Sequence, residues 1–506
     1  MFLSGTQYRL VAEKVLIFKK TRHSTLGHDR PTWHGLKIPR HRATMVFTEI
    51  GSGKPVRQGS PSGIFITGTA MYVSSLSIKN IRAISDFKFE VKATECAGWH
   101  VFLGDNGSGK SSLIKSLAII FAGGSKVSAS RQIWEDWLSQ GCNTAEIAVI
   151  INRDDSFDQY VLKGRQPGSF TMRATIERAQ RDPASGATAE VAISFNSQNS
   201  KTAERTIWAN GNGWFSSSFG PFRRFSGGDR DWDRLFVSPE YRRIAAHLSA
   251  FGEDVAFTEA LYWLQQLKVS SLESPSSKSG QILEAVKNFV NSARLLPHGS
   301  HIADITTKAV TLRDAAGATV VVDQMSDGYR SVLSLTFELL RQMFLSFGDD
   351  IMLKALTVNP GTVDVPGVVA IDEIDAHLHP TWQTRIGDWF VDHFPRVQFI
   401  ITTHSPLICR AAKRGSIWRL PTPGSNDSAV RVQGQEFDRL VKGNILEAYG
   451  TDYFGKDVDV PQSSKEAEQQ IARLSMLKAQ GRLSPDQDET LKSLQAARPT
   501  VASKID

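Results

Sequence analysis

Residues 104–111 read Gly104-Asp105-Asn106-Gly107-Ser108-Gly109-Lys110-Ser111 and match the phosphate-loop pattern G-x-x-x-x-G-K-[ST]. In this pattern the glycines let backbone N–H groups surround a β-phosphate, the lysine reaches the β- and γ-phosphate oxygens, and the hydroxyl binds Mg²⁺. The apolar residues 99–103 predict a strand before the loop, and residues 112–120 predict a helix after it. A bound phosphate would therefore lie at a helix N-terminus. The alternative, an accidental glycine-rich turn, requires neither the strand nor the helix.

The loop supplies the first group of expected ligands for ATP and Mg²⁺. We expect the nucleotide to be bound by Asn106, Gly107, Ser108, Gly109, Lys110, Ser111 and Ser112. Lys110 is also expected to be catalytic, because the loop lysine reaches the β- and γ-phosphate oxygens. Ser111 is expected to ligate the metal.

A second predicted strand, residues 367–371, is apolar and is followed by Asp372 and Glu373. Successive residues of a strand point to opposite faces, so one carboxylate can hold the Mg²⁺ water shell while the other orients a water at the γ-phosphate. We expect Asp372 to be the second metal-side residue and Glu373 to be the general base. Two solvated acids at the end of a surface strand are the alternative.

A third apolar strand is predicted over 399–403, and His404-Ser405-Pro406 follows it. Sheets of α/β proteins place ligands at the carboxyl ends of their strands. We therefore expect His404 to contact the γ-phosphate as a catalytic residue. A structural histidine is the alternative.

An amphipathic helix is predicted to begin at Met325-Ser326-Asp327-Gly328-Tyr329. A serine hydroxyl and the N–H groups at a helix start form an anion site, so Ser326 and Gly328 are expected to bind nucleotide. A plain N-cap is the alternative.

The order of these motifs resembles the ABC-type ATPase head shared by transporters, SMC and Rad50-like proteins, RecF and the OLD-like ATPases. Three runs resemble the stand-alone bacterial ATPases of the OLD/RecF-like group, with the Septu-type and retron-associated anti-phage ATPases closest; they are Ile371-Asp372-Glu373-Ile374-Asp375-Ala376-His377-Leu378-His379-Pro380, Ile401-Thr402-Thr403-His404-Ser405-Pro406 and Phe219-Gly220-Pro221-Phe222-Arg223. The resemblance covers roughly residues 71–450. It implies an α/β P-loop NTPase fold of the ABC type and two heads that dimerise face to face. Each ATP would lie between one phosphate loop and the partner's signature helix, so Ser326 and Gly328 would act in trans.

The sequence departs from that class at two places. The signature Leu-Ser-Gly-Gly-Gln reads Met325-Ser326-Asp327-Gly328-Tyr329, and the Asp327 carboxylate would repel a γ-phosphate unless it turned away to cap its own helix. No glutamine stands clearly at the Q-loop. Gln132 is a candidate, but residues 219–224 occupy the place where that glutamine would be sought.

Charge is unevenly distributed along the 506 residues. The net charge is +7, whereas residues 1–70 hold 11 Lys/Arg against 3 Asp/Glu, so the rest of the chain has a net charge of −1. The composition of residues 1–70 favours a disordered extension or an over-called start, with a nucleic-acid-binding arm as the alternative. Any nucleic-acid surface on the remainder must be a local patch.

The ATPase head is predicted to span residues 71–450. Alternating residues over 72–91 predict two strands joined by a short turn. Further strands are predicted at 145–151, 171–176 and 189–195. They would form an antiparallel insertion at about 145–215, followed by a helical lobe at about 239–296. The aromatic and basic residues 214–225 could stack on single-stranded nucleic acid or could form a partly buried loop.

Residues 451–506 are predicted to be a linker and a C-terminal helical hairpin. Ala467, Ile471, Leu474 and Leu477 lie near one face of a helix over 465–479. Ser484-Pro485-Asp486-Gln487 has the pattern of a helix start, and Gly481 would lie in the turn. The apolar stripe either docks a partner or packs on its own domain.

Three cysteines, Cys96, Cys142 and Cys409, form no C-x-x-C pair, which argues against a zinc site or a disulfide framework and suits a reducing compartment. No apolar run approaches the ~18 residues of a membrane span. These features favour a cytoplasmic protein with no membrane partner.

The leading hypothesis is a soluble ABC-type ATPase that hydrolyses ATP between two dimerised heads. It would be the switch or sensor subunit of an anti-phage defence system, forming a homodimer or higher homo-oligomer and working with a separate nuclease effector; DNA or RNA is a candidate partner. One alternative is a RecF/SMC-like DNA-repair ATPase. A transporter ATP-binding subunit is another, against which Asp327, the motif 377–380 and the antiparallel insertion speak. An OLD-like nuclease would need a toprim domain, but only 102 residues follow His404, with Asp457-Val458-Asp459 as the D-x-D candidate.

Overall fold

The computed structural model describes residues 72–124, 126–152, 168–179, 190–195, 214–223, 238–252, 257–425, 427–444 and 462–496, with isolated residues between these ranges. All of them belong to one unit, Phe65–Asp506. The predictions for residues 1–70, for the linker over 451–461 and for Asp457-Val458-Asp459 lie outside the described residues.

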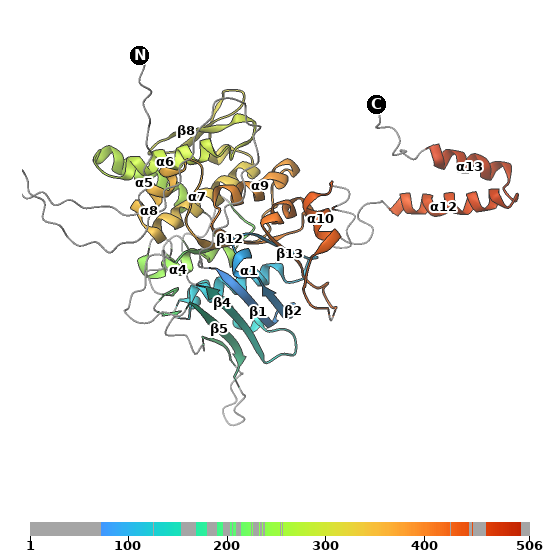
Figure 1. Cartoon of the computed structure of the whole chain (residues 1–506), viewed down its shortest axis with the longest axis horizontal. Coiled ribbons are helices and arrows are strands. Elements are labelled where there is room, and N and C mark those ends of the chain that lie inside the picture. The colour runs from blue at the N-terminus through green and yellow to red at the C-terminus, as the bar shows by residue number, and fades with distance from the viewer. Residues whose placement is uncertain are drawn as a thin grey trace, which may run out of the picture. The chain divides into compact units, whose positions relative to one another are not determined.

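A six-stranded sheet carries the motifs. Its order is β14-β13-β3-β12-β11-β7, and Figure 1 labels two of its strands, β12 and β13. The strands are β3 (Gly98–Leu103), β7 (Ser216–Phe219), β11 (Gly367–Ile371), β12 (Val397–Thr403), β13 (Gly415–Arg419) and β14 (Val430–Arg431). All neighbouring pairs are parallel except β13–β14 at the edge. Every residue of β3, β11 and β12 is buried, as continuous apolar strands of a parallel sheet require.

A second sheet is antiparallel, with the order β2-β1-β4-β5-β6. Its strands are β1 (Val73–Ile81), β2 (Ile84–Glu90), β4 (Thr144–Asn152), β5 (Ser169–Arg178) and β6 (Val191–Ser194). The predicted strands are thus confirmed, but the sheet is not confined to an insertion at 145–215. Strand β1 pairs with both β2 and β4, so the two strands before the phosphate loop belong to the same sheet.

The helix α1 (Lys110–Ala122) packs between the two sheets, since it contacts β7, β11 and β12 on one side and β1, β4 and β5 on the other. Eleven of its 13 residues are buried, which explains why it shows no polar face. The side chain of Gln398 also joins the sheets, because its amide exchanges two hydrogen bonds of 2.8 Å with the backbone of Val73.

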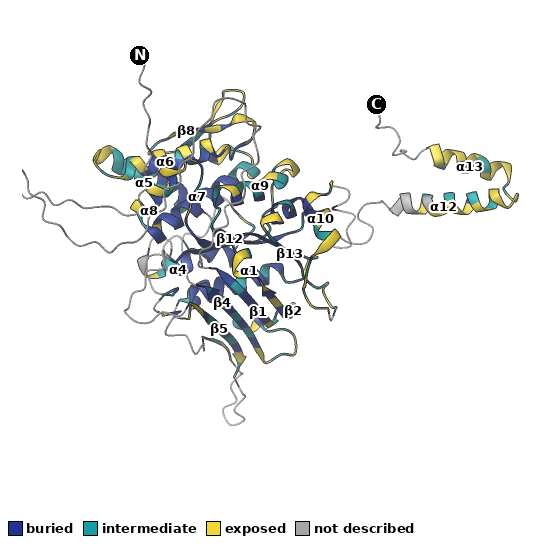
Figure 2. Ribbon diagram, in the orientation of Figure 1, coloured by how far each residue is buried: buried dark blue, intermediate teal, exposed yellow. Residues whose placement is uncertain are grey.

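Four helices pack on one another as a lobe: α5 (Thr258–Glu273), α6 (Ser279–Ser292), α7 (Asp327–Phe347) and α8 (Asp349–Val358). Helix α4 (Arg242–Ala245) packs on α1 instead, and α9 (Pro380–His393) packs on the 3-10 segment Pro406–Arg414 and on β3. Residues 274–278, which include three serines, separate α5 from α6. Helix α7 lies in the middle of this lobe and is dark along most of its length in Figure 2. A small antiparallel sheet that the sequence analysis did not predict follows α6; it comprises β8 (His301–Ile305), β9 (Val310–Arg313) and β10 (Thr319–Val321).

After β12, the chain continues through a 3-10 segment (Pro406–Arg414) and α10 (Gly434–Lys442). The predicted hairpin helices are present as α12 (Gln462–Ala479) and α13 (Pro485–Ala496). Ser484 and Gln487 exchange backbone-to-side-chain hydrogen bonds of 3.0 and 3.3 Å, which is a capping box. Gly481 lies in the turn with φ +67°. Among the described residues, no helix combines the length and apolarity needed to cross a membrane.

Candidate functional site

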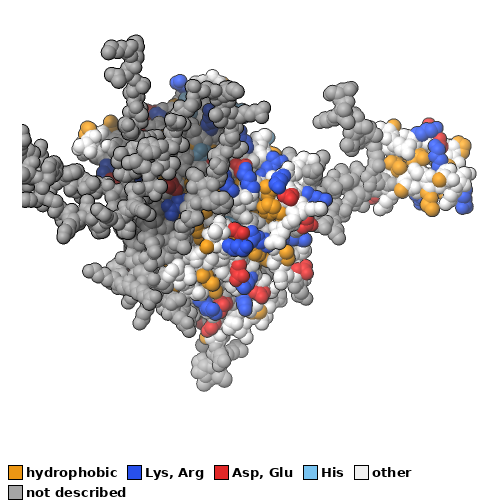
Figure 3. Space-filling model, in the orientation of Figure 1, with side chains coloured by type: hydrophobic (Ala, Val, Ile, Leu, Met, Phe, Trp, Pro, Cys, Tyr) orange, Lys and Arg blue, Asp and Glu red, His pale blue; other side chains and the backbone are white. Residues whose placement is uncertain are grey.

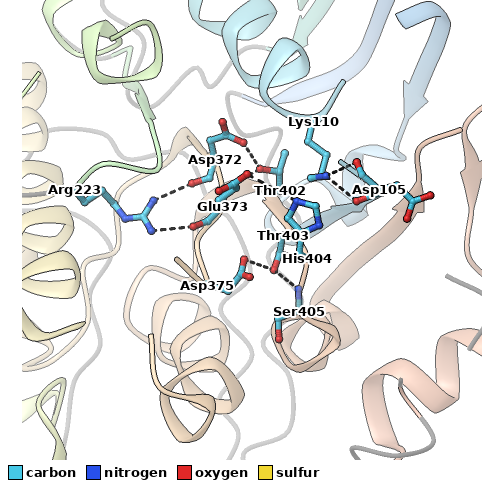
Figure 4. Close-up of polar contacts among 11 residues, drawn as sticks. Asp105, Lys110, Arg223, Asp372, Glu373, Asp375, Thr402, Thr403, His404 and Ser405 are labelled. Carbon is cyan, nitrogen blue, oxygen red and sulfur yellow. Dashed lines mark hydrogen bonds and ion pairs between the residues drawn. The ribbon is translucent and has the colours of Figure 1, made fainter. Parts of the chain in front are cut away.

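Three neighbouring strands end at the same edge of the parallel sheet. In the register, Leu103 of β3 lies beside Thr403 of β12, and Ile371 of β11 lies beside Ile401 of β12. The phosphate loop follows β3, His404 follows β12 and the acidic pair follows β11. The edge therefore brings together motifs that are up to 300 residues apart in the sequence, as Figure 4 shows.

The phosphate loop has the backbone that its glycines predict. Gly107 and Gly109 have φ +81° and +96°, and a Cβ at Gly109 would lie 2.5 Å from Cγ1 of Ile84. No side chain caps α1 at Gly109, so the N–H groups of its first turn are directed to the loop. The buried Oγ of Ser108 has no hydrogen-bond partner within the described residues. This cradle of N–H groups and an orphan hydroxyl fits a phosphate.

The side chain of Lys110 hydrogen-bonds to the backbone of its own phosphate loop. Its Nζ donates to the backbone carbonyls of Gly104 at 2.7 Å and Asp105 at 2.8 Å. A lysine ammonium has three donors, so one is left for a phosphate oxygen after these two contacts. Burial lowers the pKa of Lys110, and the carboxylates of Glu373, Asp372, Asp105 and Asp375 oppose that shift. The acidic pair thus lies within electrostatic reach of the lysine.

A threonine that the sequence analysis did not single out organises the two acids. The Oγ1 of Thr402 donates to Oδ1 of Asp372 and accepts from the backbone N–H of Glu373 at 2.9 Å. Asp372 is buried, whereas the Glu373 side chain is 39% exposed. The predicted separation of the two carboxylates into different environments is therefore present. A carboxylate is an oxygen ligand of the kind that Mg²⁺ prefers, and the roles of Asp372 and Ser111 as metal ligands stay a prediction.

His404 lies beside the acid predicted to be the base. Its Nε2 is 3.9 Å from Oε1 of Glu373, and both side chains are partly exposed. The hydroxyl of Thr403 holds the backbone on either side of His404. It donates to the carboxylate of Asp375 and accepts from the N–H of Ser405 at 2.9 Å. The placement brings His404 to the same opening as Glu373, and its contact to a γ-phosphate stays a prediction.

Arg223 is a site residue that the sequence analysis did not identify. Its side chain is 4% exposed and donates to carbonyls of the turn after β11, as Figure 4 shows for Asp372 and Glu373. Burial lowers the pKa of Arg223 to about 10, against the opposing effect of nearby carboxylates, so it is charged at neutral pH. The only sequence signal was its place in the Phe219–Arg223 run.

Of the two alternatives for residues 214–225, burial holds for most of the aromatic side chains and stacking on nucleic acid does not. Four of them are at most 5% exposed; they are Trp214, Phe215, Phe219 and Phe225. They are buried because β7 is a strand of the parallel sheet, next to β11. On the visible part of Figure 3 that is not grey, basic and acidic side chains are interspersed over the antiparallel sheet.

Ser326 and Gly328 lie at a different opening. Ser326 occupies the N-cap position of α7, but its side chain makes no capping hydrogen bond. Asp327 pairs with Arg330 instead of capping the helix. The helix start lines a pocket of about 630 Å³ with, among others, His377, His379 and Trp382, and none of the residues that line it belongs to the phosphate loop.

Gln132 lies between two 3-10 turns, Val127–Ser130 and Trp134–Trp137, and its amide donates to the carbonyl of Ser130 at 3.0 Å. Strand β7 pairs with β11, and Arg223 lies four residues after the end of β7, in the stretch where a Q-loop glutamine would be sought.

The fold and the site define a P-loop ATPase, with a parallel sheet that carries the phosphate loop, a second, antiparallel sheet and a lobe of helices. Two family models match the chain. "AAA domain, putative AbiEii toxin, Type IV TA system" matches residues 173–410, and "AAA ATPase domain" matches residues 71–210. Together the two matches cover residues 71–410.

Curated relatives confirm the expected likeness to Septu and retron ATPases. The "Retron Ec83 probable ATPase" of Escherichia coli is 34% identical over 153 residues, which are 30% of this chain and 26% of that protein. "Septu protein PtuA" of Bacillus mycoides (strain KBAB4) is 24% identical over 361 residues, 69% of this chain and 40% of that protein. The matched part of the chain thus spans less than half of the length of either relative. Among solved structures, the Smc head bound to the C-winged helix domain of ScpA has a TM-score of 0.42 and 16% identity, covering 72% of this chain and 98% of that one.

Proposed function

We propose that the protein is an ABC-type ATPase that binds and hydrolyses ATP with Mg²⁺ between two dimerised heads. It acts as the switch or sensor subunit of an anti-phage defence system and works with a separate nuclease effector. The observation that carries the ATPase part is the meeting of Lys110, Asp372, Glu373 and His404 at one sheet edge.

Each residue has a role in this proposal. The N–H groups of the loop and Lys110 bind the phosphates, and Ser111 and Asp372 hold the metal. When bound, Mg²⁺ neutralises charge on the phosphate oxygens. Glu373 accepts the proton of the attacking water, and its partly exposed carboxylate is open to that water. His404 orients the γ-phosphate from the neighbouring strand.

The pocket at the start of α7 supports action in trans. Ser326 has a hydroxyl that caps no backbone N–H of its helix, and the residues lining its pocket include none from the phosphate loop of the same chain. In a two-fold dimer, the same surface of each head would face the other's loop. Asp327 lines the same pocket, and its ion pair with Arg330 offsets part of the repulsion between its carboxylate and a phosphate.

The defence role and the effector rest on the relatives, which are named as ATPases of a retron or as a Septu protein. The test is plating efficiency of phages on cells that express the chain with the products of its neighbouring genes. We expect wild type to reduce plating and Lys110→Ala to restore it, because the loop cation is lost. A wild-type protein that hydrolyses ATP but protects against none of a broad phage panel would refute the defence role alone.

A further inference from the structure

The guanidinium of Arg223 joins three elements. Its Nε donates to Oγ of Ser331 on α7 at 3.1 Å. Its Nη1 donates to the carbonyls of Gly220, after β7, at 2.8 Å and Asp372 at 2.9 Å. Its Nη2 donates to the carbonyls of Glu373 at 3.0 Å and Ile374 at 3.3 Å. Figure 4 shows the two contacts to Asp372 and Glu373.

These contacts bear on the conformation of the turn after β11. Glu373 has φ +45°, in the left-handed region that a residue with a side chain rarely adopts. Such a residue persists only where its surroundings over-determine it. Thr402 fixes the N–H of Glu373, and Arg223 fixes its carbonyl. Because the N–H and the carbonyl of Glu373 are both held, the backbone of this residue fixes the direction in which its side chain points.

The contact to Ser331 links Arg223 to helix α7. Ser331 lies five residues after Ser326 on the same helix. A displacement of α7 when Ser326 engages a ligand would act on Arg223 through the Ser331 hydroxyl. The planar fork of the guanidinium would then transmit it to three consecutive carbonyls of the turn.

We propose that Arg223 is a positioning residue: it fixes the direction of the Glu373 carboxylate and couples it to the signature helix α7. This inference rests on the proposed ATP hydrolysis. In it, Arg223 touches neither ATP nor water, and it acts through the backbone of Asp372, Glu373 and Ile374.

The test compares Arg223→Lys and Ser331→Ala with wild type in ATP affinity and turnover. A lysine keeps the charge but cannot reproduce the five-donor fork. We expect kcat of Arg223→Lys to fall about 10- to 100-fold, as for a small misplacement of a catalytic group, while the Kd for ATP changes less than about threefold. Ser331→Ala, which leaves the carbonyl contacts intact, should lower kcat by a few-fold and keep the same Kd.

Arg243→Lys is the matched control. Arg243 is a half-buried arginine that likewise donates to backbone: its Nη1 bonds to the carbonyl of Trp214, before β7, at 2.8 Å. Its replacement should lower Tm without changing kcat. Equal kcat values for Arg223→Lys and Arg243→Lys would overturn the positioning role, and so would a Kd that rises in proportion to the loss of kcat. If Arg223→Lys does not fold, an unchanged kcat in Ser331→Ala overturns the coupling.

Hydrogen exchange separates this inference from the proposed function. The N–H of Asp372 donates to the carbonyl of Phe219. The N–H of Glu373 donates to Oγ1 of Thr402, and the N–H of Ile374 donates to the carbonyl of Thr402. In the nucleotide-free protein, these amides should exchange at least about tenfold faster in Arg223→Lys than in Arg243→Lys. Equal exchange would refute the inference, whereas a wild-type protein without turnover would refute only the ATPase proposal.

Discussion

At the scale of single residues, hydroxyl and guanidinium groups around the acids determine what the acids can do. Thr402 binds both Asp372 and the peptide of Glu373, so the two acids share one support yet differ in exposure. A buried acid beside Lys110 suits the metal, and an exposed acid suits proton transfer.

Glu373→Gln should still bind ATP but stop turnover, because glutamine keeps the shape of the side chain and cannot accept the proton. We expect kcat to fall by at least about 10²-fold, the usual contribution of a general base, and ATP to trap the closed dimer. Steady-state turnover and size measurements with and without ATP check this. Full turnover by the purified variant would remove Glu373 from the mechanism.

His247 is a buried residue that makes stability depend on pH. It hydrogen-bonds to Ser216 and Ser218, and burial, together with Arg243, lowers its pKa to about 3. Burial likewise lowers the pKa of His100 to about 4. Unfolded imidazoles take up protons below about pH 6.5. The unfolded state then binds more protons, so stability is lost as pH falls from about 6.5 toward 4.

We expect each of the two histidines to contribute a slope of about 1.4 kcal/mol per pH unit in that window. His247→Gln should remove about one such slope, because the amide can bond to the serines but does not titrate. Urea unfolding at several pH values measures it, and the carboxylates common to both proteins cancel in the comparison. The same pH dependence in both proteins would contradict the assignment.

At the scale of elements, the site is the common edge of β3, β12 and β11, and the start of α7 belongs to another opening. The residues that line the pocket at the start of α7 include none from the phosphate loop of the same chain. Two-fold dimerisation is the arrangement that would use both the pocket and the loop.

Mixing Ser326→Arg and Lys110→Ala subunits should restore activity that neither variant has alone. Each mixed dimer would contain one intact composite site, with Lys110 from the first subunit and Ser326 from the second. About half of the wild-type turnover per mixed dimer is expected from the symmetry. Verified mixed dimers that stay inactive would favour a structural role for Ser326 at the helix start.

At the scale of the whole molecule, the hairpin of α12 and α13 contains buried residues of its own. Leu474 and Leu491 are 7% and 2% exposed, while Met476 of α12 is 64% exposed. Figure 3 shows apolar side chains on the hairpin surface. The predicted stripe is thus buried or half-buried, and the exposed Met476 is the apolar side chain through which we propose that the hairpin docks a partner.

Deleting residues 464–506 should leave ATPase activity near wild type and abolish co-purification of the effector. Met476→Glu should weaken co-purification in the intact chain, because it places a charge on the exposed apolar surface. Gln470→Glu, at another exposed position of α12, is the matched control. If the deletion unfolds the head or removes ATP binding, the hairpin is part of the core and the docking proposal is wrong.

Local patterns were enough to locate the phosphate loop, the acidic pair, His404 and most strands. A buried strand, a glycine-rich turn and a capping box are each specified by residues within about ten positions of one another, so their signals are contiguous. The helix starts at Ser326 and Ser484 were located for the same reason.

Other features arise only from contacts between distant segments. Apart from Gly220, the residues that accept hydrogen bonds from Arg223 lie 108 to 151 positions after it in the sequence. Thr402 lies 29 positions after Glu373. The aromatic residues near β7 are buried because that strand pairs with β11, and β1 and β2 join the antiparallel sheet because β1 pairs with β4. Hydrogen bonding and burial depend on what folding brings alongside a residue, and no neighbouring residue in the sequence carries that information.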